Sequence, residues 1–475
     1  PLTELQPAEY ALMIGLLKGP SYFDPRRYPQ RAQQRRDVVL RLMFEQHLLN
    51  RQQYEQAVQQ PVTVIPRGQY LNSGYAAYLD GVKKELRQLS ISPEYRDQGI
   101  KVFTYLDTQA QRAAEQALQT QLAPLDGELQ AAMIVANYQQ AEIIAMVGSK
   151  DGVQGGFNRA IDARRQIGSI IKPVIYLEAL AQRGRYTLAS RLEDNPIRLR
   201  SNDQDWQPQN FDKQYRGNVS LIDALADSLN IPTVRLGLQL GLPAINDGLR
   251  KLGLNRKVKL HPAALLGAIE LSPLEVTQLY QTLANNGRHQ QLTTLYAVTD
   301  SNGHVLHMRN HQLTQRYSNE EIYLLQYALM QAAKTGTAKM LNRQFPGVTL
   351  AGKTGTSDDG RDSWYVGFDR RDLVVTWVGR DDNSATKLTG GSGALPLYRA
   401  FLLRRGPVTL DLSNPQGVMN AYFDAASGSI IDPECGDGQR YPAIISFVPE
   451  VPTCADGRPP QEDWWDVLLG AGFSN

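Results

Sequence analysis

The arrangement of strand and helix patterns along the chain is the feature that most constrains its fold. Apolar runs at residues 131–136 and 141–147 are separated by polar residues and predict an antiparallel hairpin. Helical patterns dominate residues 169–335, and strand patterns return between residues 349 and 378. A sheet whose strands come from both ends of a segment, with helices inserted between them, is an α+β arrangement. We therefore expect a central antiparallel sheet flanked by helices.

Length, charge and hydropathy exclude several classes of protein. The 475 residues suffice for about three folded units. Lysine and arginine number 50 and aspartate and glutamate 48, so the net charge of +2 carries no signature of nucleic-acid binding. The longest apolar run near the start, residues 11–17, is far too short to span a membrane. Because the chain begins at Pro1 without a leader, we expect it to belong to a longer protein whose membrane anchor lies outside these residues.

Shifts in composition and periodicity divide the chain into four expected regions. Residues 1–58 show helical periodicity, and residues 59–105 are expected to be a linker region. Residues 106–405 carry the strands and helices of the main domain. Residues 406–475 are expected to form a small C-terminal domain or tail.

Two cysteines, Cys435 and Cys454, lie in that C-terminal region. Without a histidine nearby in the sequence they do not make a structural zinc site, and we predict neither a metal nor a cofactor. A cross-link stabilises most where a loop-rich segment has little core of its own. We therefore favour a disulfide formed in an oxidising compartment over two unrelated thiols.

Three short motifs follow one another in the expected main domain. They are Ser-x-x-Lys, Ser-x-Asn and Lys-Thr-Gly-Thr, and this ordered set is typical of penicillin-binding proteins and class A β-lactamases. Each motif alone is a weak signal, whereas the ordered set is far more specific. The candidate site residues are Ser169, Lys172, Ser228, Asn230, Lys353, Thr354, Gly355 and Thr356.

The spacing of Ser169 and Lys172 suits the activation of a nucleophile. Ser169 opens a helical stretch, so we expect Lys172 on the same face with its amine near the serine hydroxyl. A lysine acts as a base only when neutral, and burial and a neighbouring cation both lower its pKa. Lys353 is the candidate for that cation. Taken alone, the same tetrapeptide indicates only a helix start with a solvated lysine.

The second motif needs a loop to point Ser228 and Asn230 into one cleft, and Pro232 supports such a break. We expect the hydroxyl to relay protons. The amide is expected to bind the substrate and Lys172 by hydrogen bonds.

The Lys-Thr-Gly-Thr motif occurs twice, at residues 334–337 and 353–356. The first copy follows a helical pattern, so we expect Lys334 to be a surface helix residue. The second copy continues a strand pattern, which places Lys353 and Gly355 on one side of the strand and the two threonines on the other. We expect Gly355 to let a ligand backbone approach closely.

Two rival site types fit the sequence less well. Residues 347–354 match the spacing of a phosphate-binding loop, but the middle residues are strand formers and the residues that follow do not readily start a helix. The histidines lie mostly in polar stretches and no G-x-S-x-G elbow is present, which argues against a Ser/His/Asp hydrolase. Ser169 therefore needs a base other than histidine.

Nearly the whole chain resembles class A penicillin-binding proteins, and it is most similar to the 1b type of Gram-negative bacteria. The resemblance implies the transpeptidase fold of that family for the main domain. Residues 3–43 are similar to the end of the family's lipid II glycosyltransferase domain, which makes residues 1–58 a remnant of it. The acidic catalytic motif of that domain is absent, so we expect no glycan polymerisation by this chain. The similar stretches of the main domain are residues 157–160, 164–173, 206–210, 267–273, 284–287 and 377–380.

The resemblance also implies the reaction, which is acyl transfer from peptidoglycan stem peptides. Ser169 would attack the penultimate D-Ala carbonyl of a stem pentapeptide, Lys172 would take the proton, and D-Ala would leave through Ser228. Backbone N–H groups of Ser169 and Thr356 would form an oxyanion hole. A neighbouring stem amine would then attack the acyl-enzyme and make a cross-link.

Binding roles follow from the same resemblance. Lys353, Thr354 and Thr356 would hold the terminal carboxylate and Asn230 the peptide amide, and a β-lactam would trap Ser169 covalently. The implied location is the periplasmic face of the bacterial inner membrane. An outer-membrane lipoprotein activator and cell-division proteins are the implied partners of the parent protein.

Two alternatives share the first half of this reaction. In a β-lactamase or a D,D-carboxypeptidase, water attacks the acyl-enzyme, and the motifs do not separate these enzymes from a transpeptidase. The glycosyltransferase-like segment favours the synthase. A β-lactam sensor or scaffold would be acylated without forming a cross-linked product.

Overall fold

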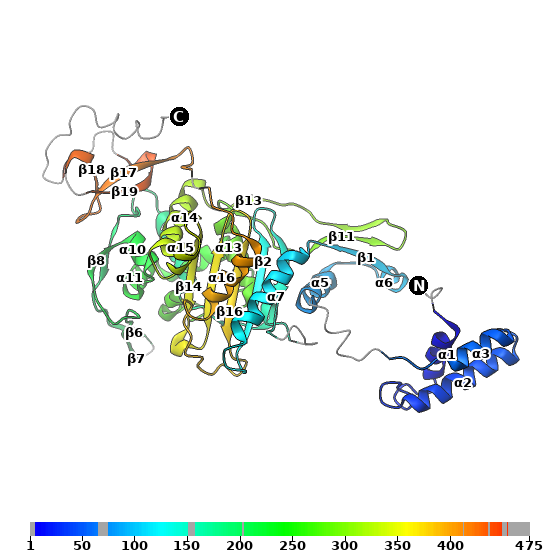
Figure 1. Cartoon of the computed structure of the whole chain (residues 1–475). Coiled ribbons are helices and arrows are strands. Elements are labelled where there is room, and N and C mark those ends of the chain that lie inside the picture. The colour runs from blue at the N-terminus through cyan, green and yellow to red at the C-terminus, as the bar shows by residue number, and fades with distance from the viewer. Residues whose placement is uncertain are drawn as a thin grey trace. The chain divides into compact units, whose positions relative to one another are not determined.

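The computed structural model describes residues 5–64, 75–150, 157–201, 204–411, 413–435, 438–448 and Cys454. The chain divides into two units, Pro1–Ser73 and Gly74–Asn475, and each is described by itself. Figure 1 shows the elements of both units coloured along the chain.

The first unit is helical, as its periodicity predicts. Pro29 occupies the start of its longest helix, where a missing N–H and a fixed φ are tolerated. The buried guanidinium of Arg36 donates to the carbonyl oxygens of Val58 and Gln60 and so ties that helix to the end of the next one. The helices are α1 (Pro7–Leu16), α2 (Pro29–Glu45) and α3 (Arg51–Gln59).

A five-stranded antiparallel sheet is the centre of the second unit, and its order is β14-β15-β16-β2-β3. The predicted hairpin forms its β2 and β3, and the strands predicted after the helical segment form the other three. Alternate residues of β2 enter two different apolar cores, Ala132 and Ile134 on one face and Met133 and Val135 on the other. The strands are β2 (Gln130–Asn137), β3 (Glu142–Val147), β14 (Ala351–Thr356), β15 (Ser363–Phe368) and β16 (Leu373–Gly379).

Helices cover both faces of this sheet, which confirms the predicted α+β class (Figure 1). One face is covered by α7 (Thr108–Leu122) and α16 (Ala394–Arg405). The other face carries the larger core, to which the helical segment between the strands contributes. The helices of that segment are α9 (Lys172–Leu180), α10 (Leu221–Ala226), α11 (Asn230–Leu240), α12 (Leu242–Lys251), α13 (Pro273–Ala284) and α14 (Asn319–Lys334). Helix α15 (Met340–Gln344), which follows α14, contributes Leu341 to the core on the face of α7 and α16.

Strand β14 lies at one edge of the sheet and pairs with β15. It begins two residues later than the strand pattern predicts, because the backbone of Thr349 pairs with the segment that follows α16: its N–H donates to Thr409 and its carbonyl accepts from Leu410. The second Lys-Thr-Gly-Thr copy therefore lies entirely within the strand. Strand β14 continues past Lys353 to Thr356, so no helix begins directly after this lysine as a phosphate-binding loop requires. The chain therefore has no phosphate-binding loop at residues 347–354.

The boundary between the units differs from the expected one, because part of the expected linker packs into the second unit. Helix α5 (Ala76–Gln88) contributes the fully buried Tyr78, whose hydroxyl donates to the carbonyl of Ile143 at 2.9 Å. Strand β1 (Ile100–Thr104) pairs with β11 (Leu295–Asp300). Long-range packing of this kind leaves no signature in a short window of sequence.

The C-terminal region forms a small sheet with the order β18-β17-β19. Val418 and Ile444 from this sheet join the larger core, so this region packs on the main domain. A disulfide links Cys435 to Cys454, with the Cα atoms 5.1 Å apart. The strands are β17 (Val418–Asp424), β18 (Ile430–Ile431) and β19 (Gly438–Ile444).

The remaining strands of the second unit form short pairs, and β12 extends the β1-β11 pair. They are β4 (Arg165–Gln166) with β9 (Glu270–Leu271), β5 (Arg191–Asp194) with β8 (Gly217–Ser220), β6 (Leu199–Ser201) with β7 (Gln204–Trp206), β10 (Arg288–His289) with β13 (Thr314–Gln315), and β12 (Val305–Met308).

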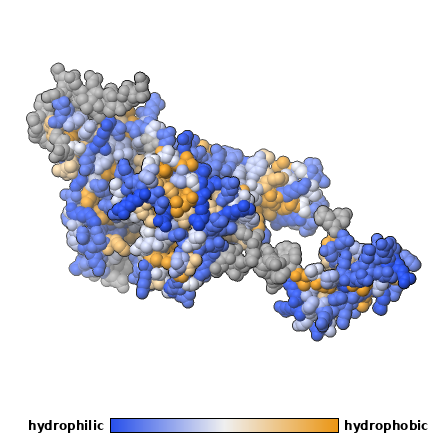
Figure 2. Space-filling view, viewed as in Figure 1, coloured by the Kyte–Doolittle hydropathy of each residue, from blue (hydrophilic) through white to orange (hydrophobic). Residues whose placement is uncertain are grey.

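Hydrophilic residues dominate the face of the molecule seen in Figure 2, with apolar residues scattered between them. Within the described ranges, none of the helices combines the length and the apolar character needed to cross a bilayer.

Candidate active site

Ser169 lies on a single 3-10 turn, Gly168–Ile171, that runs directly into α9. Gly168 has φ +53°, and a Cβ there would clash with the carbonyl oxygen of Thr356. Only glycine permits this approach, which holds the turn against the end of β14. In a 3-10 turn residues three apart eclipse one another, so Ser169 and Lys172 leave the turn on the same side. The first motif and the third are thus brought together.

The amine of Lys172 is fully buried and makes its hydrogen bonds with the second motif. It donates to the carbonyl oxygen of Ser228 at 2.6 Å, to Asn230 Oδ1 at 2.7 Å and to the carbonyl oxygen of Leu229 at 3.1 Å. Burial lowers the pKa of Lys172 well below its usual value, and the positive charge of Lys353 lowers it further. The lysine is therefore held where the neutral, basic form is favoured.

The amine of Lys353 is also fully buried and donates to Ser228 Oγ at 2.7 Å. Lys172 approaches the same hydroxyl at 3.3 Å, so Ser228 lies between two amines. Burial lowers the pKa of Lys353 to about 7, against the negative charge of Asp227, which raises it. Ser228 has φ +59°, a backbone conformation that residues other than glycine rarely adopt and that often marks functional sites.

The Lys172 amine does not point toward the Ser169 hydroxyl as expected. In the described part of the chain this hydroxyl forms no hydrogen bond with Lys172, whose amine is turned toward the carbonyl groups around Ser228. Catalytic hydrogen bonds of this kind are often long before substrate is bound. Ser169 is partly exposed, whereas both lysines are buried.

The threonines and the glycine of the third motif have separate surroundings. Thr354 Oγ1 donates to Thr337 Oγ1 at 2.8 Å, and Thr356 Oγ1 accepts from the N–H of Gly390 at 2.9 Å. A Cβ at Gly355 would lie 2.6 Å from the side chain of Ile170. The bare backbone of this glycine lets the turn that carries Ser169 pack on β14, and the close approach of a ligand backbone to Gly355 stays a prediction.

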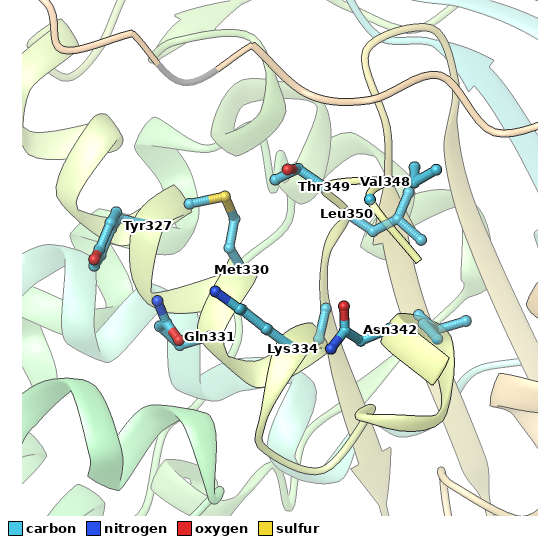
Figure 3. A pocket seen from close by; sticks show the side chains of 11 residues that line it. Tyr327, Met330, Gln331, Lys334, Asn342, Val348, Thr349 and Leu350 are labelled. Carbon is cyan, nitrogen blue, oxygen red and sulfur yellow. The ribbon is translucent and has the colours of Figure 1, made fainter. Parts of the chain in front are cut away.

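The first Lys-Thr-Gly-Thr copy is divided between two places. Lys334 is exposed at the end of α14, as expected, and points into a pocket of about 390 Å³ with Gln331 and Asn342 around it (Figure 3). None of the candidate site residues lines this pocket. Thr337, by contrast, returns to contact Thr354. The sequence analysis assigned no role to Thr337. The repeat of Thr-Gly-Thr was the one sequence feature that pointed to it.

No group of three or more His, Cys, Asp or Glu side chains among the described residues is arranged to hold a metal ion. The chemistry of the cluster rests instead on two hydroxyls, two amines and one carboxamide, those of Ser169, Ser228, Lys172, Lys353 and Asn230. A partly exposed hydroxyl three residues before a buried amine whose pKa is lowered is suited to nucleophilic catalysis.

Replacing Lys353 with methionine is expected to change how stability depends on pH. The pKa of Lys353 falls from 10.5 to about 7 on folding, so between these pH values the unfolded chain holds a proton that the folded chain lacks. The free energy of unfolding of the unmodified chain therefore decreases as the pH falls from about 10.5 to about 7. Below about 7, Lys353 causes no further decrease. Urea unfolding of both proteins across this range measures the effect.

The methionine variant should gain stability relative to the unmodified chain as the pH falls toward 7. A matched Lys334→Met variant, altered at an exposed lysine, should show no such trend. If the difference between the Lys353→Met variant and the unmodified chain stays constant with pH, the lowered pKa is wrong.

A protein family and several known proteins are similar to this chain. The family described as the penicillin binding protein transpeptidase domain matches residues 131–401. Penicillin-binding protein 1B of Vibrio cholerae is 43% identical over 93% of this chain and 58% of its own length. The corresponding protein of Escherichia coli is 39% identical over 95% of this chain and 54% of its own length. The chain therefore belongs to the penicillin-binding proteins and contains their transpeptidase domain.

Solved structures show the same fold. Penicillin-binding protein 1A from Haemophilus influenzae matches with a TM-score of 0.77 at 21% identity, over 97% of this chain and 87% of that one. PonA1 from Mycobacterium tuberculosis, in complex with penicillin V, matches with a TM-score of 0.63 at 22% identity, over 72% of this chain and 95% of that one. The chain spans 54% to 62% of the length of the 1B relatives from E. coli, V. cholerae and H. influenzae.

Proposed function

We propose that this chain is a serine D,D-transpeptidase that cross-links peptidoglycan stem peptides and is acylated by β-lactams. The observation that carries the proposal is the Ser228 hydroxyl between the buried amines of Lys172 and Lys353, next to the turn that carries Ser169. This arrangement provides a nucleophile, a base with a lowered pKa and a path for a proton.

The first half-reaction makes an ester and releases D-alanine. Ser169 Oγ bonds to the penultimate D-Ala carbonyl carbon, and its proton passes to the neutral amine of Lys172. Collapse of the tetrahedral intermediate breaks the peptide bond, and the leaving nitrogen receives a proton through the Ser228 hydroxyl. Backbone N–H groups of Ser169 and Thr356 stabilise the oxyanion, and the contact between Gly168 and Thr356 keeps these two stretches adjacent.

Substrate binding uses the edge strand. An extended peptide can lie along β14, as peptides add to exposed sheet edges. Protonated Lys353 attracts the terminal carboxylate, and Thr354 and Thr356 donate hydrogen bonds to it. The Asn230 amide binds the peptide backbone. Approach of a carboxylate favours the charged form of Lys353, whose pKa of about 7 allows it to be protonated on binding.

In the second half-reaction an amine of a neighbouring stem attacks the ester carbonyl. The new amide bond forms and the ester bond breaks. The proton lost by the attacking amine passes to Lys172, which then returns it to Ser169 Oγ. Activator and cell-division partners and a location on the periplasmic face of the inner membrane belong to the proposal for the parent protein. Glycan polymerisation by the parent is also part of that proposal, because the chain spans only part of its relatives.

The test uses the chain as it is. Fluorescent penicillin should attach covalently to one residue per molecule, in the peptide that contains Ser169, and should be released slowly. A stem pentapeptide and an amine acceptor should yield a new amide with loss of D-alanine.

Rapid turnover of penicillin would assign the chain to the β-lactamases instead. A product formed only with water would assign it to the carboxypeptidases, and acylation without any peptide product would assign it to the sensors.

A further inference from the structure

Asn210 lies outside the three motifs, is 2% exposed, and accepts hydrogen bonds from the start of α11. Its Oδ1 accepts from the N–H of Asn230 at 2.8 Å and from that of Ile231 at 3.3 Å. These donors begin a helix whose N-cap residue, Leu229, has no side chain able to accept them. Asn210 lies in a different segment of the chain, and its side chain accepts the hydrogen bonds that an N-cap side chain normally accepts.

The orientation of the Asn210 amide is determined by Asp194, which is fully buried at the end of β5. Asn210 Nδ2 donates to Asp194 Oδ1 at 2.6 Å and to the carbonyl oxygen of Gln214 at 2.8 Å. The second carboxylate oxygen accepts from the N–H of Arg216 at 3.1 Å. Because an ionised carboxylate only accepts, Nδ2 must face Asp194 and Oδ1 must face α11.

The same segment also holds the side chain of Asn230. Asn230 Nδ2 donates to the carbonyl oxygen of Gln209 at 2.7 Å, while Asn230 Oδ1 accepts from Lys172 at 2.7 Å. Residues 209 and 210 therefore fix Asn230 at both its backbone and its amide. Strand β5, which ends at Asp194, packs against α11 and pairs with β8.

We propose that Asn210, oriented by Asp194, is a positioning residue for acylation: it holds the turn of Ser228 and Asn230 and thereby the amine of Lys172. The inference rests on the proposed function, since it assigns a role in that reaction. Asn210 does not touch the reacting atoms and acts through Asn230. A displacement of about 1 Å at a reacting group can lower a rate about 100-fold, so such a residue affects catalysis strongly.

The test compares three variants by time courses of labelling with fluorescent penicillin. In Asn210→Leu, the acylation rate constant should fall roughly 10- to 100-fold, while the final labelled fraction of folded protein stays high. In Asn210→Asp, two carboxylates face each other and the rate constant should fall at least as far. Adding Asp194→Asn to that variant restores a donor facing an acceptor and should recover at least about tenfold of the rate.

A merely structural role changes the labelled fraction and not the rate constant per labelled molecule. Asn285→Leu is the matched control: Asn285 is equally buried, also donates to backbone carbonyls, and lies at the end of α13. A fall in its labelled fraction would report lost stability, whereas its rate constant should stay unchanged.

The inference is overturned if Asn210→Leu acylates at the unmodified rate. If that variant does not fold, a double variant no faster than Asn210→Asp overturns it equally. Absence of labelling in the unmodified chain would instead refute the proposed function.

Discussion

Replacing Ser169 with alanine is expected to abolish covalent labelling by penicillin. Removal of the nucleophile removes the atom to which the acyl group bonds, so the loss should exceed about 1,000-fold. Gel fluorescence after incubation with fluorescent penicillin measures it. The fold should persist, because Ser169 is partly exposed and its hydroxyl has no hydrogen bond within the described residues.

The matched control for this experiment is Lys334→Ala, in the copy of Lys-Thr-Gly-Thr that ends α14. Lys334 is exposed and lines a pocket that none of the other candidate site residues lines, so labelling should be unchanged. Equal labelling of the Ser169→Ala protein and the unmodified chain would refute the assignment of the nucleophile. Loss of labelling in the Lys334→Ala protein would refute the choice between the two copies.

Replacing Lys172 with methionine is expected to lower the acylation rate constant by about 100- to 10,000-fold, the usual contribution of a general base. Methionine fills a similar volume but accepts no proton. Burial and the charge of Lys353 lower the pKa of Lys172 well below its usual value, so the neutral amine is more favoured here than in an exposed lysine. Stopped-flow measurement with a chromogenic β-lactam gives the rate constant directly.

A second substitution at the same position separates basicity from charge. Lys172→Arg keeps a cation and hydrogen-bond donors, but a guanidinium does not lose its proton in proteins. If Lys172 acts as the base, the arginine variant should be as slow as the methionine variant. An arginine variant within about tenfold of the unmodified rate would show that only the charge matters.

Part of the site was predictable because its chemistry lies in short motifs. Ser169 and Lys172 are three residues apart, and any tight helical turn places them on one side. The alternation along β14 likewise follows from the period of a strand, and Lys353 and Gly355 do lie on one side of it, toward Ser228 and Ile170.

Other features depend on residues far apart in the chain. Ile170 packs against Gly355. Thr337, in the first Lys-Thr-Gly-Thr copy, contacts Thr354 in the second. Asn210 belongs to none of the three motifs, and its hydrogen bonds to Asp194 and to Asn230 depend on the tertiary structure.

The sequence by itself indicated the candidate catalytic side chains, and it determined that strands from both ends of a helical segment share one sheet. Those conclusions need only periodicity and spacing, which are local properties. Tertiary structure alone decided that Lys172 and Lys353 are both fully buried around the hydroxyl of Ser228. The lowered pKa values depend on desolvation by residues from many segments, and no local pattern records how those segments pack.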